Sequence, residues 1–204
     1  MMKRIDTIGV SRLRMGTDGS GIRTLVAAKG CPLRCKYCLN PHSWNGEGEV
    51  QTLTVAEMYE QLKVDNLYFQ ASDGGVTFGG GEPLLYASFI KEFVEYTDHC
   101  WNIMLETSLN VPREDLEMVI GHVDKFVVDI KSADDAIYHA YTGSSNTRVV
   151  DNLRFLLSRV GAEQVQVRVP RIPDYTTEET VEATVRQLKG LGVREIEVFS
   201  YFVV

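Results

Sequence analysis

The chain has 204 residues, of which 44% are hydrophobic and 24% are charged, and this suits one globular domain with a sizeable core. The net charge of −7 argues against nucleic acid and an anionic membrane surface as partners. No stretch approaches the ~20 apolar residues of a membrane span, and the N-terminal segment MMKRIDTIGV lacks the apolar core of a signal peptide. We therefore expect a cytoplasmic protein whose four cysteines serve a metal or catalysis rather than disulfides.

Short β-branched runs alternate along the chain with amphipathic stretches at helical spacing. The predicted strands cover residues 22–28, 75–78, 102–107, 125–130, 164–170 and 195–201. The first predicted helix starts at Val55, because Thr54 and Glu57 have the spacing of a capping box. Further helices are expected over residues 84–97, 113–122, 134–141, 147–160 and 177–191.

Strands joined by helical crossovers predict an α/β protein with a parallel sheet, either open or curled into part of a barrel. The periodicity does not choose between these two forms. No repeat, low-complexity tract or interdomain linker is visible, so residues 1–204 are expected to form a single domain. Residues 9–21 and 41–50 are rich in Gly, Ser, Asn and Asp and are expected to be surface loops.

Unusual polar residues follow the predicted strands at their carboxyl ends, where ligands bind in parallel α/β folds. Cysteines follow the first strand and the sequence GGGEP follows the second. The later strands end with the following residues: Glu106, Thr107, Asp129, Lys131, Arg168, Arg171 and Tyr201. We therefore expect polar groups to gather at one mouth of the sheet.

The segment GCPLRCKYCLN holds Cys31, Cys35 and Cys38 in C-x3-C-x2-C spacing. A structural zinc site normally uses two separated C-x2-C pairs, and only CKYC has that spacing here. His42 is close enough in sequence to complete a Cys3His zinc site, so zinc stays open as an alternative. A cubane iron–sulfur cluster usually takes four cysteines, and three would leave one iron free for an outside ligand.

The cysteine spacing resembles the signature of the radical S-adenosylmethionine (SAM) enzymes, and GGGEP supports the resemblance. The segment DGSGIRTLVAAKGCPLRCKYCLNPHSW resembles the opening of the glycyl-radical-enzyme activating enzymes. FQASDGGVTFGGGEPLL, VVDIKS, YTGSSNTRVVDNL and VRVPRIPDYT follow in the order of the members that act on pyruvate formate-lyase. The similarity extends from about residue 8 to residue 201 and implies a partial (β/α)6 TIM-like barrel of the radical SAM type.

Some positions depart from the family pattern. Ser20 replaces a proline, and Phe202 stands where the family has a histidine near the SAM adenine. Because the sequence ends at Val204, we expect a domain shortened at its C-terminus. No second cysteine-rich segment lies between Cys38 and Gly79, which favours the pyruvate formate-lyase type over members with a ferredoxin-like insert.

The resemblance assigns Cys31, Cys35 and Cys38 to a 4Fe-4S cluster whose open iron binds SAM. It places SAM against Tyr37, Leu39, Gly80, Gly81, Glu82, Asp129, Lys131 and Arg168. The glycines allow the backbone to approach the ligand, and a carboxylate suits the SAM ammonium group. A monovalent cation is implied at Glu106, Thr107 and Asp129, where a glutamate replaces the family's aspartate and lengthens the arm.

Several other residues have structural interpretations. Cys100 ends an amphipathic helix and is expected to be a core cysteine. Asp18 and Arg23 belong to the opening motif, although an Asp-Gly turn and a surface arginine would look the same. The four histidines show no triad spacing and are expected to be surface or structural residues: His42, His99, His122 and His139.

The resemblance implies reductive cleavage of SAM to methionine and a 5′-deoxyadenosyl radical, which abstracts hydrogen from a glycine Cα of a large partner enzyme. The implied partners are a glycyl radical enzyme, first of all pyruvate formate-lyase, and flavodoxin or ferredoxin as electron donor. An activator of another glycyl radical enzyme, or of anaerobic ribonucleotide reductase, is the enzymatic alternative. An inactive remnant and a zinc-stabilised binding module are the alternatives from a different class.

Overall fold

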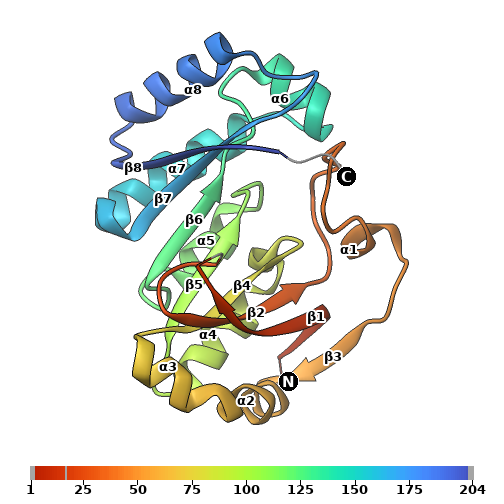
Figure 1. Cartoon of the computed structure of the whole chain (residues 1–204), viewed down its shortest axis with the longest axis vertical. Coiled ribbons are helices and arrows are strands. Elements are labelled where there is room, and N and C mark those ends of the chain that lie inside the picture. The colour runs from red at the N-terminus through yellow and green to blue at the C-terminus, as the bar shows by residue number, and fades with distance from the viewer. Residues whose placement is uncertain (1–2, 17, 202–204) are drawn as a thin grey trace.

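The computed structural model describes residues 3–16 and 18–201 (Figure 1). The strands are β1 (Arg4–Met15), β2 (Ile22–Ala28), β3 (Gln51–Thr54), β4 (Gly75–Gly80), β5 (Asn102–Thr107), β6 (Lys125–Asp129), β7 (Val165–Arg171) and β8 (Glu195–Ser200). The α-helices are α1 (His42–Asn45), α2 (Val55–Leu62), α3 (Asn66–Ser72), α4 (Ala87–Tyr96), α5 (Arg113–Val119), α6 (Asp135–Thr142), α7 (Thr147–Arg159) and α8 (Glu178–Gly190). Short 3-10 helices are η1 (Lys63–Asp65), η2 (Pro83–Tyr86) and η3 (Ala162–Gln164). Phe202 and Val204, on which the expectation of a shortened C-terminus depends, lie outside the described residues.

The strands form one sheet with the order β3-β1-β2-β4-β5-β6-β7-β8. From β2 to β8 every neighbouring pair is parallel, and these are the six strands predicted from the sequence. β1 lies antiparallel to both β2 and β3. Figure 1 shows the sheet curving from β3 near the bottom to β8 near the top, with α2 and α3 at one end and α8 at the other. The predicted α/β class with a curved, incomplete barrel is confirmed.

The expectation of a surface loop over residues 9–21 is wrong for its first half, because β1 continues to Met15. Only Ile5 and Thr7 of this strand are buried, so the sequence carries no extended alternation of apolar and polar residues. The register of β1 on β2 also shifts twice. Backbone pairing with β2 therefore specifies this strand more than side-chain burial does.

Two helix predictions show how local signals act. The capping box of Thr54 and Glu57 is present, and it starts α2 at Val55 as predicted. The helix predicted over residues 84–97 is divided into η2 and α4. The loop expected over residues 41–50 includes the short helix α1.

None of the described helices is long and apolar enough to cross a membrane.

Arg23 lies at the start of β2 and is fully buried, so it is not a surface arginine. Its Nε donates to Thr77 Oγ1 at 2.7 Å, and its Nη2 donates to the carbonyl oxygens of Val76 and Asn102 at 2.8 and 2.9 Å. Its Nη1 donates to the Asn102 side chain at 3.0 Å and to the Ser20 carbonyl at 3.4 Å. The guanidinium thus ties β2, β4 and β5 together at their amino ends, because a five-donor group satisfies several buried acceptors at once.

We predict that Arg23→Met lowers the free energy of unfolding by about 2–4 kcal/mol, because the buried acceptors around it lose their donor. Arg148→Met is the matched control, since Arg148 is exposed and its replacement should change stability by less than about 0.5 kcal/mol. Urea unfolding of both variants measures the difference. Equal stabilities of the two variants would contradict this role for Arg23.

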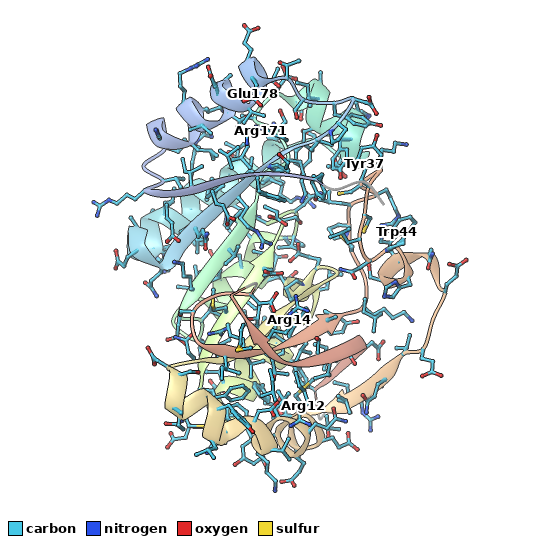
Figure 2. All side chains as sticks on the ribbon, in the orientation of Figure 1. Arg12, Arg14, Tyr37, Trp44, Arg171 and Glu178 are labelled. Carbon is cyan, nitrogen blue, oxygen red and sulfur yellow. The ribbon has the colours of Figure 1, made fainter. Side chains whose placement is uncertain are left out.

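Asp65 links the start of the chain to the helices below the sheet. Its buried carboxylate accepts two hydrogen bonds from Arg12 Nε, at 2.9 and 3.1 Å, and one from Thr24 Oγ1 at 2.8 Å. Arg12 Nη2 also pairs with it, and Figure 2 shows Arg12 near the bottom of the molecule. These hydrogen bonds, led by that of Arg12, hold the pKa of Asp65 below its usual range.

A depressed pKa in the folded state adds stability above the pKa of the unfolded chain, and this contribution is lost as pH falls through the folded value. Asp65→Asn should therefore cost about 1–2 kcal/mol at neutral pH, discounted for the half-exposed Arg12. The deficit should shrink as the pH falls below about 4. Urea unfolding across this pH range tests the prediction, and a deficit of the same size at every pH would refute it.

Candidate functional site

A cavity of about 190 Å³ lies at the carboxyl ends of the parallel strands. It is lined by Cys31, Leu33, Cys35, Cys38, Leu39, Asn40, Gly80, Gly81, Glu82, Glu106, Thr107, Ser108, Asp129, Lys131, Arg168 and Tyr201. Every site residue predicted from the sequence is in this set except Tyr37. Parallel strands place their carboxyl ends at one edge, which explains why residues distant in sequence meet here.

The cysteine loop, residues 30–40, follows β2 and is fixed at both sides. Its backbone N–H groups at Arg34 and Lys36 donate to the carbonyl oxygens of Thr142 and Tyr141 at the end of α6, at 2.9 and 3.1 Å. The Arg34 guanidinium also lies 4.8 Å from the centre of the Trp44 ring in α1. The loop therefore bridges from β2 to α6, and its cysteines line the cavity.

The three thiols of the loop are half-buried and line the same cavity. Burial raises the pKa of the Cys31 thiol to about 12 and also raises the pKa of the Cys35 thiol. Without a metal these two thiols are protonated at neutral pH, so metal binding would release protons and would depend on pH.

The glycine-rich turn after β4 packs directly on the start of the cysteine loop. The Gly81 N–H donates to the Ala28 carbonyl at 3.0 Å, and the Glu82 N–H donates to the Gly30 carbonyl at 2.7 Å. A Cβ at Gly81 would overlap the Gly30 carbonyl oxygen, and Gly80 has a φ of +84°. Side chains at these two positions would separate the turn from the loop.

Glu82 is 1% exposed, and its carboxylate is surrounded by donors from its own turn and from the end of β5. Oε1 accepts from Thr107 Oγ1 at 2.7 Å and from the Leu84 N–H at 3.3 Å. Oε2 accepts from the N–H and Oγ of Ser108 at 2.9 and 2.6 Å. Burial raises the pKa of Glu82, and these hydrogen bonds oppose that rise. The four acceptor positions of the carboxylate are thus filled by the chain.

Four charged residues that line the cavity form a network. Arg168 Nε donates to Asp129 Oδ1 at 2.9 Å, and Arg168 Nη1 donates to Glu106 Oε1 at 3.1 Å. Lys131 Nζ lies 3.3 Å from Asp129 Oδ2 and donates to the Tyr201 hydroxyl at 3.1 Å. Burial, the largest single effect, lowers the pKa of Lys131, but the combined effects of Asp129, Tyr201 and Cys35 outweigh it and raise that pKa. Lys131 is therefore charged at neutral pH.

Tyr37, expected beside the ligand, and Arg171, expected among the polar residues at the mouth of the sheet, do not line the cavity. The Tyr37 hydroxyl donates to Asp174 at 3.0 Å, and its ring contacts those of Tyr141 and Tyr175 outside the cavity lining. Figure 2 shows Tyr37 at the upper end of the cysteine loop, beside α6. Arg171 pairs with Glu178 of α8 at 2.6 Å, on the outer side of the sheet (Figure 2).

Sequence reasoning missed three residues that line the cavity: Leu33, Asn40 and Ser108. Asn40 Nδ2 donates to the Gly80 carbonyl at 3.2 Å and so holds the loop on the glycine turn. The asparagine directly after the CKYCL segment was the available signal for this contact.

Cys100 is exposed, so the expectation of a core cysteine is wrong. Helix α4 ends before it and leaves its side chain outside the core.

The donor set bears on both metals considered from the sequence. Among the described residues, no group of three or more His, Cys, Asp or Glu side chains converges on a position for one metal ion. His42 does not line the cavity, although it would have to complete a Cys3His zinc site. The ligands of a cubane cluster bind different irons and need not converge on one point. Three thiols around one cavity therefore fit a cluster with an open iron.

Comparison with known proteins defines the class. The sequence model of the Radical SAM superfamily matches residues 25–188. SuiB of Streptococcus suis bound to its precursor peptide SuiA superposes with a TM-score of 0.67 at 14% identity, over 87% of this chain and 38% of that chain. SuiB bound to S-adenosylmethionine gives a TM-score of 0.65 at 15% identity, over 85% of this chain and 39% of that chain. The fold is that of a radical SAM enzyme, as the resemblance implied.

Curated relatives narrow the assignment. The pyruvate formate-lyase-activating enzyme of Clostridium pasteurianum is 33% identical over 189 residues, which are 90% of this chain and 77% of that protein. The enzyme of the same name from Staphylococcus aureus is 34% identical over 170 residues, which are 79% of this chain and 67% of that protein. The chain belongs to the radical SAM family of glycyl-radical-enzyme activating enzymes that includes these pyruvate formate-lyase-activating enzymes.

We predict that Ser108→Ala lowers the free energy of unfolding by about 1–3 kcal/mol, because the buried Glu82 carboxylate loses a donor. Since the Ser108 hydroxyl favours the ionised form of Glu82 and lowers its pKa against the effect of burial, the deficit should shrink as the pH falls and the carboxyl group is protonated. Ser158→Ala, at an exposed position of α7, is the control and should change stability by less than about 0.5 kcal/mol. Chemical unfolding of both variants at two pH values measures the deficit. A Ser108→Ala variant as stable as the control would contradict the claim that Ser108 stabilises the buried Glu82 carboxylate.

Proposed function

We propose that this enzyme installs a glycyl radical on a partner enzyme, first of all pyruvate formate-lyase. The observation that carries the proposal is the convergence of three cysteine thiols, a glycine turn and a charge network on one cavity. The membership of the chain in the activating-enzyme family supports the choice of reaction. The choice of partner rests on the names of the relatives and on the lack of a second cysteine-rich segment between Cys38 and Gly79.

In this proposal Cys31, Cys35 and Cys38 hold a 4Fe-4S cluster, and SAM binds in the adjoining cavity. Gly80 and Gly81 let the turn pack directly on the segment that leads into the cysteine loop, so that the turn lies beside the three thiols. Bound together, the reduced cluster and SAM would supply the one-electron chemistry that removes hydrogen from a glycine Cα. The residues of the chain bind, orient and shield these groups.

The charge network suits a zwitterionic ligand. Lys131 is 6% exposed and positively charged, whereas Asp129 stays ionised because Lys131 and Arg168 hold its pKa low against the effect of burial. Both signs are therefore fixed at the cavity wall before a ligand arrives, so little reorganisation is needed on binding. Each of the three ligands expected for a monovalent cation already contacts a protein group, and the proposed function includes no such ion.

The glycine of the partner would reach the cavity from its open mouth, and an electron donor of the flavodoxin or ferredoxin type would reduce the cluster. Such chemistry requires a reducing and anaerobic cytoplasm. Co-incubation with purified pyruvate formate-lyase and with anaerobic ribonucleotide reductase separates the proposed partner from the alternative. A glycyl radical signal on the second enzyme alone would overturn the choice of partner.

The experiment that tests the proposed function is anaerobic reconstitution with iron and sulfide, followed by reduction with dithionite and assay for 5′-deoxyadenosine formed from SAM. We expect iron uptake and product formation by the wild type. Cys35→Ala should abolish product, because one cluster ligand is lost. Cys100→Ala is the matched control, since this cysteine is exposed and far from the loop in sequence, and it should retain full iron content and activity.

Zinc uptake in place of iron would overturn the proposal. A cluster that forms without SAM cleavage would overturn the activase function while leaving the assignment of the cysteines intact.

A further inference from the structure

The three residues expected to bind a monovalent cation have other partners in this structure. Glu106 accepts from Arg168 at 3.1 Å, and Asp129 accepts from Arg168 at 2.9 Å and lies 3.3 Å from Lys131 Nζ. The Thr107 hydroxyl donates to Glu82 and accepts from the Leu109 N–H at 2.9 Å. Protein donors thus already occupy the Thr107 hydroxyl, both Asp129 oxygens and Oε1 of Glu106, and the cation nearest to both carboxylates is the guanidinium of Arg168.

Charge leads to the same conclusion. The two carboxylates of Glu106 and Asp129 are matched by the two cations of Arg168 and Lys131, so this pair of acids has no unbalanced charge. Asp18 is a further carboxylate near Glu106 and contributes to raising its pKa, and it forms an ion pair with Arg14. An additional cation at this wall would meet the guanidinium of Arg168 in a position where like charges repel.

The strand register explains why a glutamate at position 106, rather than an aspartate, can reach Arg168. Asp129 on β6 lies directly opposite Arg168 on β7, whereas Glu106 is on β5, one strand further away. Strands are separated by about 4.8 Å, so β5 and β7 are about 10 Å apart. An arginine and a glutamate are long enough to meet across β6, and an aspartate at position 106 would be one methylene shorter. The replacement of the family's aspartate by Glu106 therefore allows the hydrogen bond that holds Arg168 in its position.

We propose that the guanidinium of Arg168 takes the place of the monovalent cation in this enzyme, and that Glu106 is the residue that holds it there. The inference deepens the proposed function and rests on SAM binding in this cavity. In this arrangement Arg168 joins β5, β6 and β7 and presents a permanent positive charge to the carboxylate of SAM. Because an arginine stays protonated at any physiological pH, this charge does not depend on the ionic composition of the solution.

The test is SAM binding to the reconstituted protein, measured by anaerobic calorimetry in potassium and in tetramethylammonium salts at equal ionic strength. We expect the wild-type dissociation constant to agree within about twofold between the two salts, a difference well below 1 kcal/mol. Arg168→Gln should weaken SAM binding at least about tenfold in tetramethylammonium, because the half-buried positive charge that faces the SAM carboxylate is lost and the two carboxylates of the wall are left unmatched. Potassium should restore part of that loss.

Glu106→Asp is the conservative variant, and it should gain a potassium response because the shorter carboxylate releases Arg168. A wild-type enzyme that binds SAM at least about tenfold more weakly without potassium would overturn the inference. So would an Arg168→Gln variant whose loss is the same in both salts.

Thermal unfolding of the cluster-free chain separates this inference from the proposed function. Potassium should leave the melting temperature of the wild type unchanged and raise that of Arg168→Gln, because only the variant has an unmatched carboxylate pair. If the wild type binds no SAM in either salt, the proposed function fails and the melting temperatures still decide the role of Arg168. A melting temperature of the wild type that rises with potassium would overturn the inference.

Discussion

The candidate site depends on the close contact between the turn after β4 and the start of the cysteine loop. The N–H groups of Gly81 and Glu82 donate to backbone carbonyls of the segment that leads into Cys31, at 3.0 and 2.7 Å. This contact is short because Gly80 and Gly81 carry no side chain, and it aligns two segments that are far apart in sequence. The loop is held in its middle by α6, through the backbone N–H groups of Arg34 and Lys36, and the three thiols line the cavity without any regular element within the loop.

Glu82 carries this constraint into the next strand. Its carboxylate accepts hydrogen bonds from Thr107 and Ser108, and the end of β5 is therefore fixed relative to the cysteine loop. Glu106, one residue earlier, leads into the charge network with Asp129 and Arg168. The cysteine loop and the charged wall belong to one hydrogen-bonded system, and this continuity preorganises the cavity before a ligand binds.

Much of this arrangement was predictable from sequence, because the parallel strands and the cysteine, glycine and charged motifs are local patterns. Strands β2 and β5 have the predicted bounds, and the residues at their carboxyl ends share one cavity. β1 was not predicted, since its pairing with β2 depends on backbone groups and leaves few side chains buried. Three further features could not be predicted from sequence, because each depends on partners that only the fold brings close. They are the burial of Arg23, the full set of hydrogen bonds to the Glu82 carboxylate, and the contact of Tyr37 with Asp174.

The central claim is that three cysteines hold a cluster with one iron open to SAM at the mouth of this sheet. Electron paramagnetic resonance of the reconstituted and reduced protein, recorded with and without SAM, tests it most directly. The account predicts that SAM changes the spectrum of the reduced cluster in the wild type, because the ligand set of one iron changes. A cluster spectrum that is identical with and without saturating SAM would contradict it.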